Sequence, residues 1–499
     1  MPLDDRPLDL SNRFLWVPRL DTRKLLVCLV FLTVFLMNVF GHTDPDFWWH
    51  LRTGQYITDT RTIPGVDLFS YTFEGEPRVA QEWASEALIS LLFAGFGYAG
   101  DVLVFASIVT LTFFLVYRLC LKLGTNDRAA AVVVFWAAML ARPSFTVRPQ
   151  VFTWLFFSIF LASLYLYHRG QTRWLWHLPV LMVLWVNLHG GFAIGLGLIA
   201  LLLLARLGEA LVAKKPLALG HPLAVLGISL AATLVNPNGF SGLSYPLSYA
   251  GFANPSARFI TEWQSPNFHE SYWLLLLASL LLFMAIGVSH RGLGAWPVML
   301  IGVLAGMALQ SARFIALYGL AMAPVLGETL KARFKLGRAA DRRAPTRILG
   351  HVNWLLLLLS IVGAIGLAVR SPNSQLKELP LPLGEFTYPA AGAEYVRVNY
   401  PEARMFNEYA WGGYLIYSLF PTQRVFVDGR ADLYGPELLN DYKNVVYLSP
   451  HWEEVLDRYG VDLVFIGKNS PLSVLLAGSP AWERVFTGEI EDIFVRNPR

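Results

Sequence analysis

The sequence has few charged residues and almost no cysteine. Asp, Glu, Lys and Arg make up 15% of its 499 residues, and the formal net charge at pH 7 is only +4. A surplus this small, without a basic block interleaved with aromatic residues, argues against nucleic-acid binding. Cys28 and Cys120 lie inside or at the end of apolar runs, so neither a disulfide framework nor a cysteine metal site is expected. No Walker or dinucleotide-binding glycine motif occurs, which argues against a machine driven by nucleotides.

Apolar residues dominate instead. They make up 55% of the chain, and the mean hydropathy is +0.45, values typical of an integral membrane protein. Runs long enough to cross a bilayer predict about eleven transmembrane helices. They lie near residues 25–41, 101–117, 128–141, 150–167, 174–188, 191–206, 221–236, 272–288, 294–309, 313–328 and 351–369.

The loops between these runs indicate the orientation of the chain. Residues 82–99 are also apolar, but they begin with Glu82 and Glu86 and are short, so we interpret them as an amphipathic helix in the membrane interface. The inner segments then hold three times as many Lys and Arg residues as the outer loops, as expected for cytoplasmic segments. We therefore expect a multi-pass protein of the cell inner (plasma) membrane with a cytoplasmic segment at 1–24. No small-residue cleavage site follows the first run, so this run is expected to be an uncleaved anchor.

The first outer loop, residues 42–100, begins with a cluster of polar and aromatic residues. Asp44 followed by Pro45 predicts a helix start, with Asp44 as N-cap and Asp46 in the first turn. His50, four residues after Asp46, would share its face, so both side chains could reach one ligand. The alternative is that Asp44 only caps the helix and Asp46 only complements its dipole. Trp48 and Trp49 are either interfacial anchors or a wall for a sugar or an isoprenoid.

Further polar motifs fall at the outer ends of the predicted spans. They are ARPSFTVRPQ (142–150), NLHGGF (187–192), NPNGF (236–240), TEWQSPNF (261–268) and QSARF (310–314). Ionisable groups at membrane depth usually line a cavity. Together Arg142, Arg148, His189 and Arg313 predict an outward-facing site for an anionic ligand, although any one of them could be a snorkelling anchor or a helix-end cap.

The composition changes near residue 371 to that of a small α/β domain, so the chain divides into a helical membrane domain at 25–369 and an outer domain at 370–499. Segments 424–430 and 461–467 are predicted strands, and segments 388–400, 434–442 and 451–460 are predicted helices. Asp428, Arg430 and Asp432 follow the first of these strands. A structural ion pair at that turn is the favoured interpretation, and a ligand site is the alternative.

These features suit glycosyl transfer from a lipid-linked sugar phosphate. The lipid tail would stay in the bilayer, and its phosphate would pair with Arg or His at the interface. The acceptor hydroxyl would need a base, for which Asp46 is the candidate. We therefore expect a hexosyl- or pentosyltransferase that inverts the sugar's configuration on the extracytoplasmic face.

The arrangement resembles the GT-C superfamily of polyprenyl-phosphate-sugar-dependent glycosyltransferases, such as the protein O-mannosyltransferases and the lipid A aminoarabinose transferases. The resemblance rests on an acidic residue after the first span, a long first outer loop, about a dozen spans and an outer C-terminal domain. It implies a GT-C-like fold, a polyprenyl-phosphate sugar donor, a protein, lipid or glycan acceptor, and a role in building the cell envelope. It gives Asp46 the place of the catalytic acid of the first loop and Glu82 or Glu86 that of a second acidic residue.

One departure concerns Asp46 itself, because relatives often carry a second acidic residue beside it, where this sequence has Pro45 and Phe47. The carboxylates and the histidine could hold Mg²⁺ or Mn²⁺, but no spacing is diagnostic of a metal site. The competing classes are a non-catalytic transporter or assembly factor for lipid-linked surface glycans, and a ligase that joins glycan chains. The absence of an internal repeat and of an acidic relay within the spans disfavours the transporter.

Overall fold

The computed structural model describes residues 20–41, 43–214, 219–249, 260–269, 273–288, 293–334, 346–370 and 388–498. Within them, every apolar run predicted to span the membrane is helical. The runs correspond to α1 (Thr22–Val39), the second part of α3 (Trp83–Lys122), α4 (Asp127–Ala141), α5 (Gln150–His168), α6 (Leu178–Leu188), α7 (Phe192–Ala213), α8 (Gly220–Ala232), α10 (Trp273–Val288), α11 (Ala295–Gln310), α12 (Ile315–Phe334) and α13 (Arg347–Arg370). A short helix, α9 (Phe240–Tyr249), was not expected from the sequence.

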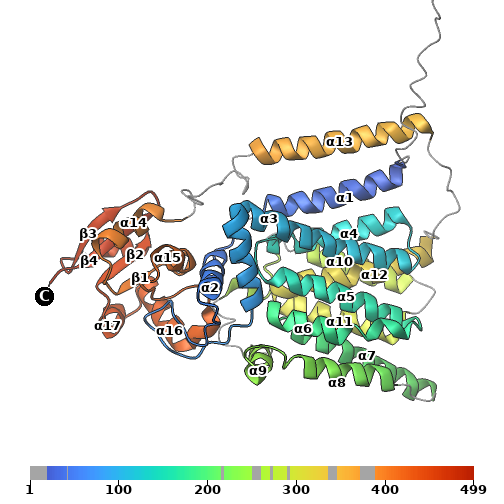
Figure 1. Cartoon of the computed structure of the whole chain (residues 1–499), viewed down its shortest axis with the longest axis horizontal. Coiled ribbons are helices and arrows are strands. Elements are labelled where there is room, and N and C mark those ends of the chain that lie inside the picture. The colour runs from blue at the N-terminus through green and yellow to red at the C-terminus, as the bar shows by residue number, and fades with distance from the viewer. Residues whose placement is uncertain are drawn as a thin grey trace, which may run out of the picture.

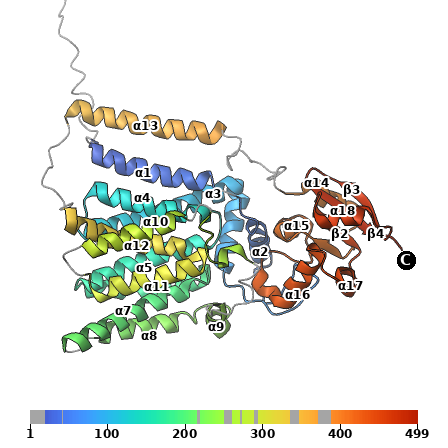
Figure 2. The ribbon, with the colours of Figure 1, turned by 180° about the vertical axis from the view of Figure 1, so that it is seen from behind.

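The helices form a bundle that fits a multi-pass membrane protein. Of those in the described residues, six are long and apolar enough to cross a membrane, so eleven crossings stays a prediction. Helices α1 and α13 pack against each other along one edge of the bundle (Figures 1 and 2). Most of the predicted cytoplasmic segment 1–24, most of the basic loop 331–347 and the start of the predicted outer domain (371–387) lie outside the described residues.

Small residues bring the central helices close together. Helix α4 packs along α12, and a Cβ added at Gly319 of α12 would lie 3.2 Å from the carbonyl oxygen of Ala137. Ala130, Ala138 and Ala323 on the same two helices are fully buried. Such residues let helix backbones approach in a membrane, where apolar burial gives no driving force between helices.

The first outer loop contains α2 (Phe47–Thr60) and the start of α3. Helix α3 is kinked at Gly97, whose φ of 64° and ψ of −170° are not helical. The part before the kink corresponds to the predicted interface helix, and it packs on α2. Gly54 makes this packing possible, because a Cβ there would lie 1.9 Å from the Glu86 carbonyl oxygen.

The C-terminal domain is α/β, as predicted, and its described part holds a sheet of order β1-β2-β4-β3. Strand β1 (Met405–Asn407) runs parallel to β2 (Leu463–Gly467), and the other neighbours are antiparallel. The remaining elements are β3 (Trp482–Thr487), β4 (Glu491–Arg496), α14 (Ala390–Asn399), α15 (Gly412–Leu419), α16 (Ala431–Val446), α17 (Trp452–Arg458) and α18 (Pro471–Ala477). Strand β2 and helices α14, α16 and α17 match predicted elements.

The predicted strand at 424–430 is wrong. This segment forms only an isolated bridge, to Ser70 of the first outer loop. Val425 N–H donates to the carbonyl of Phe69, and Tyr71 N–H donates to the carbonyl of Val425. The Asn407 side chain accepts from Phe426 N–H at 2.8 Å. Loop and side-chain partners therefore satisfy the backbone groups that a sheet neighbour would otherwise satisfy.

The C-terminal domain docks on α2 and the first outer loop at one end of the bundle (Figure 1). Buried Arg430 binds Asp428 of its own domain at 2.6 Å and Asp67 of the loop at 2.5 Å. The structural ion pair expected at this turn is therefore present, and it also joins the two parts of the chain.

Trp48 belongs to the same docking surface. Its ring centroid lies 5.4 Å from that of Tyr388, 5.2 Å from that of Tyr414 and 5.0 Å from that of Tyr417. The side chain is 2% exposed. Trp48 is therefore neither an interfacial anchor nor a substrate wall, because the C-terminal domain covers it.

Candidate functional site

A cavity of about 1210 Å³ lies where the bundle, the first outer loop and the C-terminal domain meet. Residues from NLHGGF, TEWQSPNF, QSARF and the end of ARPSFTVRPQ line it, together with Asp44, Asp46 and Glu82. Its wall also includes apolar side chains of α7 and α11: Ile194, Leu198, Leu201, Leu300, Leu304 and Met307. The cavity thus joins a charged outer region to an apolar groove within the bundle.

Asp44 and Asp46 form a turn ahead of α2. The helix begins at Phe47, two residues later than predicted, and Asp46 occupies the N-cap position without capping through its side chain. The Asp44 carboxylate accepts from the Asp46 backbone N–H at 2.9 Å, and the Asp44 backbone carbonyl accepts from the Phe47 N–H at 3.1 Å. Asp44 therefore organises the turn, and the Asp46 carboxylate is left for another partner.

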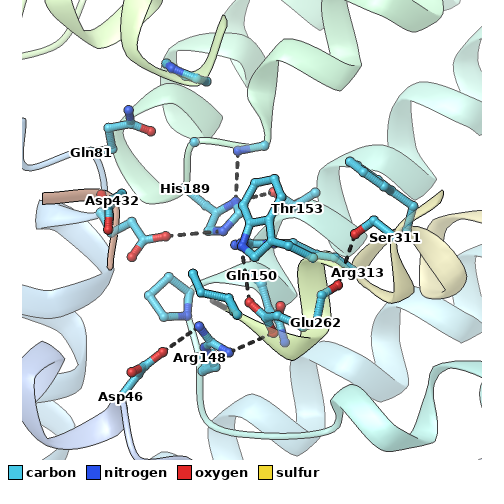
Figure 3. Close-up of a pocket in the computed structure, with 18 of the residues that line it drawn as sticks. Asp46, Gln81, Arg148, Gln150, Thr153, His189, Glu262, Ser311, Arg313 and Asp432 are labelled. Atoms are coloured by element: carbon cyan, nitrogen blue, oxygen red, sulfur yellow. Dashed lines mark hydrogen bonds and ion pairs between the residues drawn. The ribbon is translucent and has the colours of Figure 1, made fainter. Parts of the chain in front are cut away.

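That partner is Arg148, whose Nη2 lies 2.6 Å from Asp46 Oδ2 (Figure 3). The C-terminal domain covers the other side of Asp46. A Cβ at Gly429 would lie 1.8 Å from Asp46 Oδ1, and one at Gly413 would lie 2.6 Å from the Pro45 carbonyl oxygen. Only glycine fits this close approach.

Glu262 completes the charged cluster and was missed as a site residue. It lies on the short helix η5 (Thr261–Trp263), with Oε2 3.1 Å from Arg148 Nη1 and Oε1 3.4 Å from Arg313 Nη1. Arg148 Nε also lies 3.5 Å from Asp44 Oδ2. The signal in the sequence was weak, because Glu262 is simply the ionisable residue of TEWQSPNF.

The carboxylates of this cluster differ in acidity. Burial raises the pKa of Asp46 to about 7, with Asp44 and Glu262 acting in the same direction and Arg148 opposing them. Burial also opposes ionisation of Glu262, but Arg148 and Arg313 outweigh it and lower its pKa. The cluster therefore pairs a carboxylate whose pKa is lowered with one whose pKa is raised to about 7, as active sites often do.

His189 lines the cavity and contacts two polar side chains. Its Nε2 lies 3.2 Å from Glu82 Oε1. Its Nδ1 lies 2.8 Å from Thr153 Oγ1 (Figure 3). Burial, with Arg313 and Arg148, lowers the pKa of His189 well below its ordinary value. That His189 pairs with the donor phosphate stays a prediction.

Glu82 and Glu86 occupy different environments. Glu86 is 1% exposed and lies 3.3 Å from His50 Nδ1 and 3.4 Å from Arg78 Nη2. The Glu82 side chain is 22% exposed, and its Oε2 lies 3.7 Å from His50 Nδ1. Burial raises the pKa of Glu82 and lowers that of His50 to about 4. Both side chains line the cavity, and Glu82 is the more exposed of the two.

The structure does not bring all predicted residues together. Arg142 begins the short helix η2 (Arg142–Ser144), is exposed and does not line the cavity. Trp49 does line it, with its ring 3.6 Å from that of His50. Polar lining residues that the sequence did not single out as a site include Arg78, Gln81, Thr153, Tyr245, Glu262 and Tyr409. Asp432, for which a ligand site was the alternative interpretation, also lines the cavity.

In the part of the chain that the structure describes, no three His, Cys, Asp or Glu side chains are grouped to hold a metal ion. The Arg148 guanidinium contacts Asp44, Asp46 and Glu262, so these carboxylates already share one cationic partner. Binding of Mg²⁺ or Mn²⁺ therefore stays a prediction, and no chemical step below uses one.

The fold matches solved glycosyltransferases. The oligosaccharyltransferase AglB from Archaeoglobus fulgidus, in complex with an inhibitory peptide and a dolichol-phosphate, aligns with a TM-score of 0.54 at 12% identity over 88% of this chain and 69% of that chain. Its apo form aligns with a TM-score of 0.51 at 13% identity over 89% and 69%. The mycobacterial arabinofuranosyltransferase AftD aligns with a TM-score of 0.51 at 16% identity, over 96% of this chain and 42% of that chain.

These similarities confirm the GT-C-like fold expected from the sequence. No protein-family model matches the chain, and no curated protein sequence does either. Function must therefore be argued from the site, because one fold can serve several chemistries.

Proposed function

We propose that the protein is a membrane glycosyltransferase that moves a sugar from a polyprenyl-phosphate donor to an acceptor hydroxyl on the extracytoplasmic face. The observation that carries this proposal is the form of the cavity. One space contains an arginine and carboxylate cluster and continues as an apolar groove between α7 and α11. A lipid-linked sugar phosphate has the same division into a charged head and an apolar tail. The GT-C-like fold, which AglB shows with a dolichol-phosphate, supports this choice.

Arg148 and Arg313 are the proposed phosphate ligands. Both line the cavity, and in this structure they share the Glu262 carboxylate. Arg313 also lies over the Trp263 ring, 4.7 Å from its centroid, which holds the guanidinium in place. A planar guanidinium binds phosphate oxygens as it binds a carboxylate. The donor phosphate would therefore displace Glu262 from between the two arginines.

Asp46 is the proposed general base. The acceptor oxygen attacks the anomeric carbon from the face opposite the phosphate, and the bond from that carbon to the phosphate oxygen breaks. The electron pair leaves with polyprenyl phosphate, and the hydroxyl proton passes to Asp46, so the sugar's configuration inverts. A carboxylate with a pKa of about 7 suits this role at neutral pH. Arg148 orients Asp46 and stabilises the charge that develops on the leaving phosphate.

The test offers purified protein in vesicles a panel of polyprenyl-phosphate sugars and acceptors, and measures released polyprenyl phosphate. We expect release that depends on an acceptor and is lost in Asp46→Asn. Lipid that crosses the vesicle membrane without release would instead establish the transporter. Release that occurs only when the acceptor is a glycan chain would establish the ligase.

A further inference from the structure

The NLHGGF motif binds the start of α3. Trp83 Nε1–H donates to Asn187 Oδ1 at 2.9 Å, and the Ser85 hydroxyl donates to the Leu188 carbonyl at 2.5 Å. His189 Nε2 lies 3.2 Å from Glu82 Oε1. Three successive residues of the motif, at 187–189, therefore each bind one residue of the turn at 82–85. This turn places the Glu82 side chain at the cavity.

The contacts of His189 fix its tautomer. The Gly191 backbone N–H, which can only donate, lies 2.9 Å from His189 Nδ1. Nδ1 must therefore accept, and the ring proton resides on Nε2, where it donates to Glu82. Because Nδ1 is an acceptor, the Thr153 hydroxyl, 2.8 Å away, donates to it, and Thr153 Oγ1 in turn accepts from the Trp185 indole N–H at 2.9 Å.

The two glycines of the motif are required for this arrangement. A Cβ at Gly191 would lie 2.3 Å from Thr153 Oγ1, and one at Gly190 would lie 2.1 Å from Gln81 Oε1. Neither φ lies in the left-handed region, so close approach and not backbone conformation explains the glycines.

We propose that His189 is a positioning residue, which as a neutral Nε2–H donor holds Glu82 so that this carboxylate binds a hydroxyl of the transferred sugar. The inference rests on the proposed function. Glu82 Oε1 is used by His189, whereas Oε2 lies beyond ordinary hydrogen-bond distance from His50 and the side chain lines the cavity. A carboxylate can accept from a sugar hydroxyl, and the Trp49 ring, which lines the same cavity, offers an apolar face for the sugar ring.

Two substitutions of His189 separate this role from simple packing. The amide nitrogen of glutamine can reach the place of Nε2, whereas that of asparagine reaches only the place of Nδ1. We expect His189→Asn to lower kcat/KM for the donor by roughly 10- to 100-fold, the loss of a charged hydrogen bond, and His189→Gln to recover most of it. His177→Asn removes a histidine that contacts Ser163 and does not line the cavity, so activity should be unchanged.

A double-mutant cycle tests whether His189 acts through Glu82. Glu82→Gln alone should lower kcat/KM about as much as His189→Asn, and adding His189→Asn to Glu82→Gln should cost less than about 3-fold more. Fully multiplicative losses, or equal losses in the Gln and Asn variants of His189, would overturn the proposal.

A measurement that needs no turnover tests the tautomer itself. In protein labelled with ¹⁵N-histidine, the His189 signals, assigned by their absence in His189→Gln, should report a neutral ring protonated at Nε2 from pH 5 to 8. A cationic ring, or a proton on Nδ1, would overturn the inference even if transfer is observed. Wild-type protein that releases no polyprenyl phosphate would overturn the proposed function, and the sugar-binding role of Glu82 with it, while the ring signals would still decide the tautomer.

Discussion

The substitution Asp46→Asn tests the proposed mechanism most directly. Asparagine keeps the size of the side chain but cannot take the acceptor proton. Loss of general-base catalysis costs about 10²- to 10⁴-fold in rate, so turnover should fall by that factor. Donor binding should persist, because Arg148 and Arg313 remain.

The structure indicates how well this variant should fold. The change removes an ion pair of 2.6 Å between groups that are 15% and 18% exposed, but Arg148 keeps contacts to Glu262 at 3.1 Å and Asp44 at 3.5 Å. The Asp46 side chain does not cap α2, so helix initiation is unaffected. We expect a loss of stability of about 1 to 2 kcal/mol, measured by thermal unfolding in detergent.

The pH dependence of the transfer rate is a second test of the role of Asp46. Only the deprotonated carboxylate can act as base, and burial raises the pKa of Asp46 to about 7. The wild-type rate should therefore rise as the pH increases through about 7 and level off above it. The residual rate of Asp46→Asn should lack this rise.

Asp44→Asn is the matched control. An asparagine side chain can still accept from the Asp46 N–H, so the turn ahead of α2 is kept. We expect turnover within about 10-fold of wild type, since only a charge 3.5 Å from Arg148 is lost. Near-normal turnover in Asp46→Asn, or a dead Asp44→Asn, would refute the assignment and point to Asp44, Glu82 or Glu86 as the base.

Three further predictions concern the donor site and the topology. Arg148→Ala and Arg313→Ala should each weaken donor binding by roughly 10- to 100-fold, and lysine should recover only part of this; unchanged donor affinity in both alanine variants would assign them to anchoring. Glu262→Gln should tighten donor binding by about 10-fold, because it removes the carboxylate that competes with phosphate for both arginines; weaker binding would show that Glu262 itself contacts substrate. A reporter fused after Leu330 should be cytoplasmic and one fused after Arg499 extracytoplasmic, and the eleven-span topology fails if both lie on one side.

The sequence alone determined the helices and their polar ends. An apolar run of sufficient length has few alternatives to a helix in a bilayer, because backbone groups must be satisfied within the segment. Because each span crosses the membrane, every second loop lies on the same side, and so do the charged residues in those loops. Arg148, His189, Arg313 and Asp46 could therefore be assigned to one end of the molecule before any tertiary contact was known.

Which side chains share the cavity was decided only by the tertiary structure. Arg142 and Arg148 occur in one motif, and Trp48 and Trp49 are adjacent, yet only Arg148 and Trp49 line the cavity. Their directions depend on local turns and on what packs against them. For Trp48, the partner is the C-terminal domain, which lies more than 300 residues away in the sequence.

The tertiary structure also decided the roles of Glu262 and His189 and the conformation of segment 424–430. The role of Glu262 arises from two arginines on other elements, and the tautomer of His189 depends on Gly191 and Thr153. Segment 424–430 has the composition of a strand, but its backbone partners are in the first outer loop. Periodicity reports which face of an element is apolar, whereas hydrogen bonds and ion pairs between distant segments depend on distances of a few ångströms that only the packed chain sets.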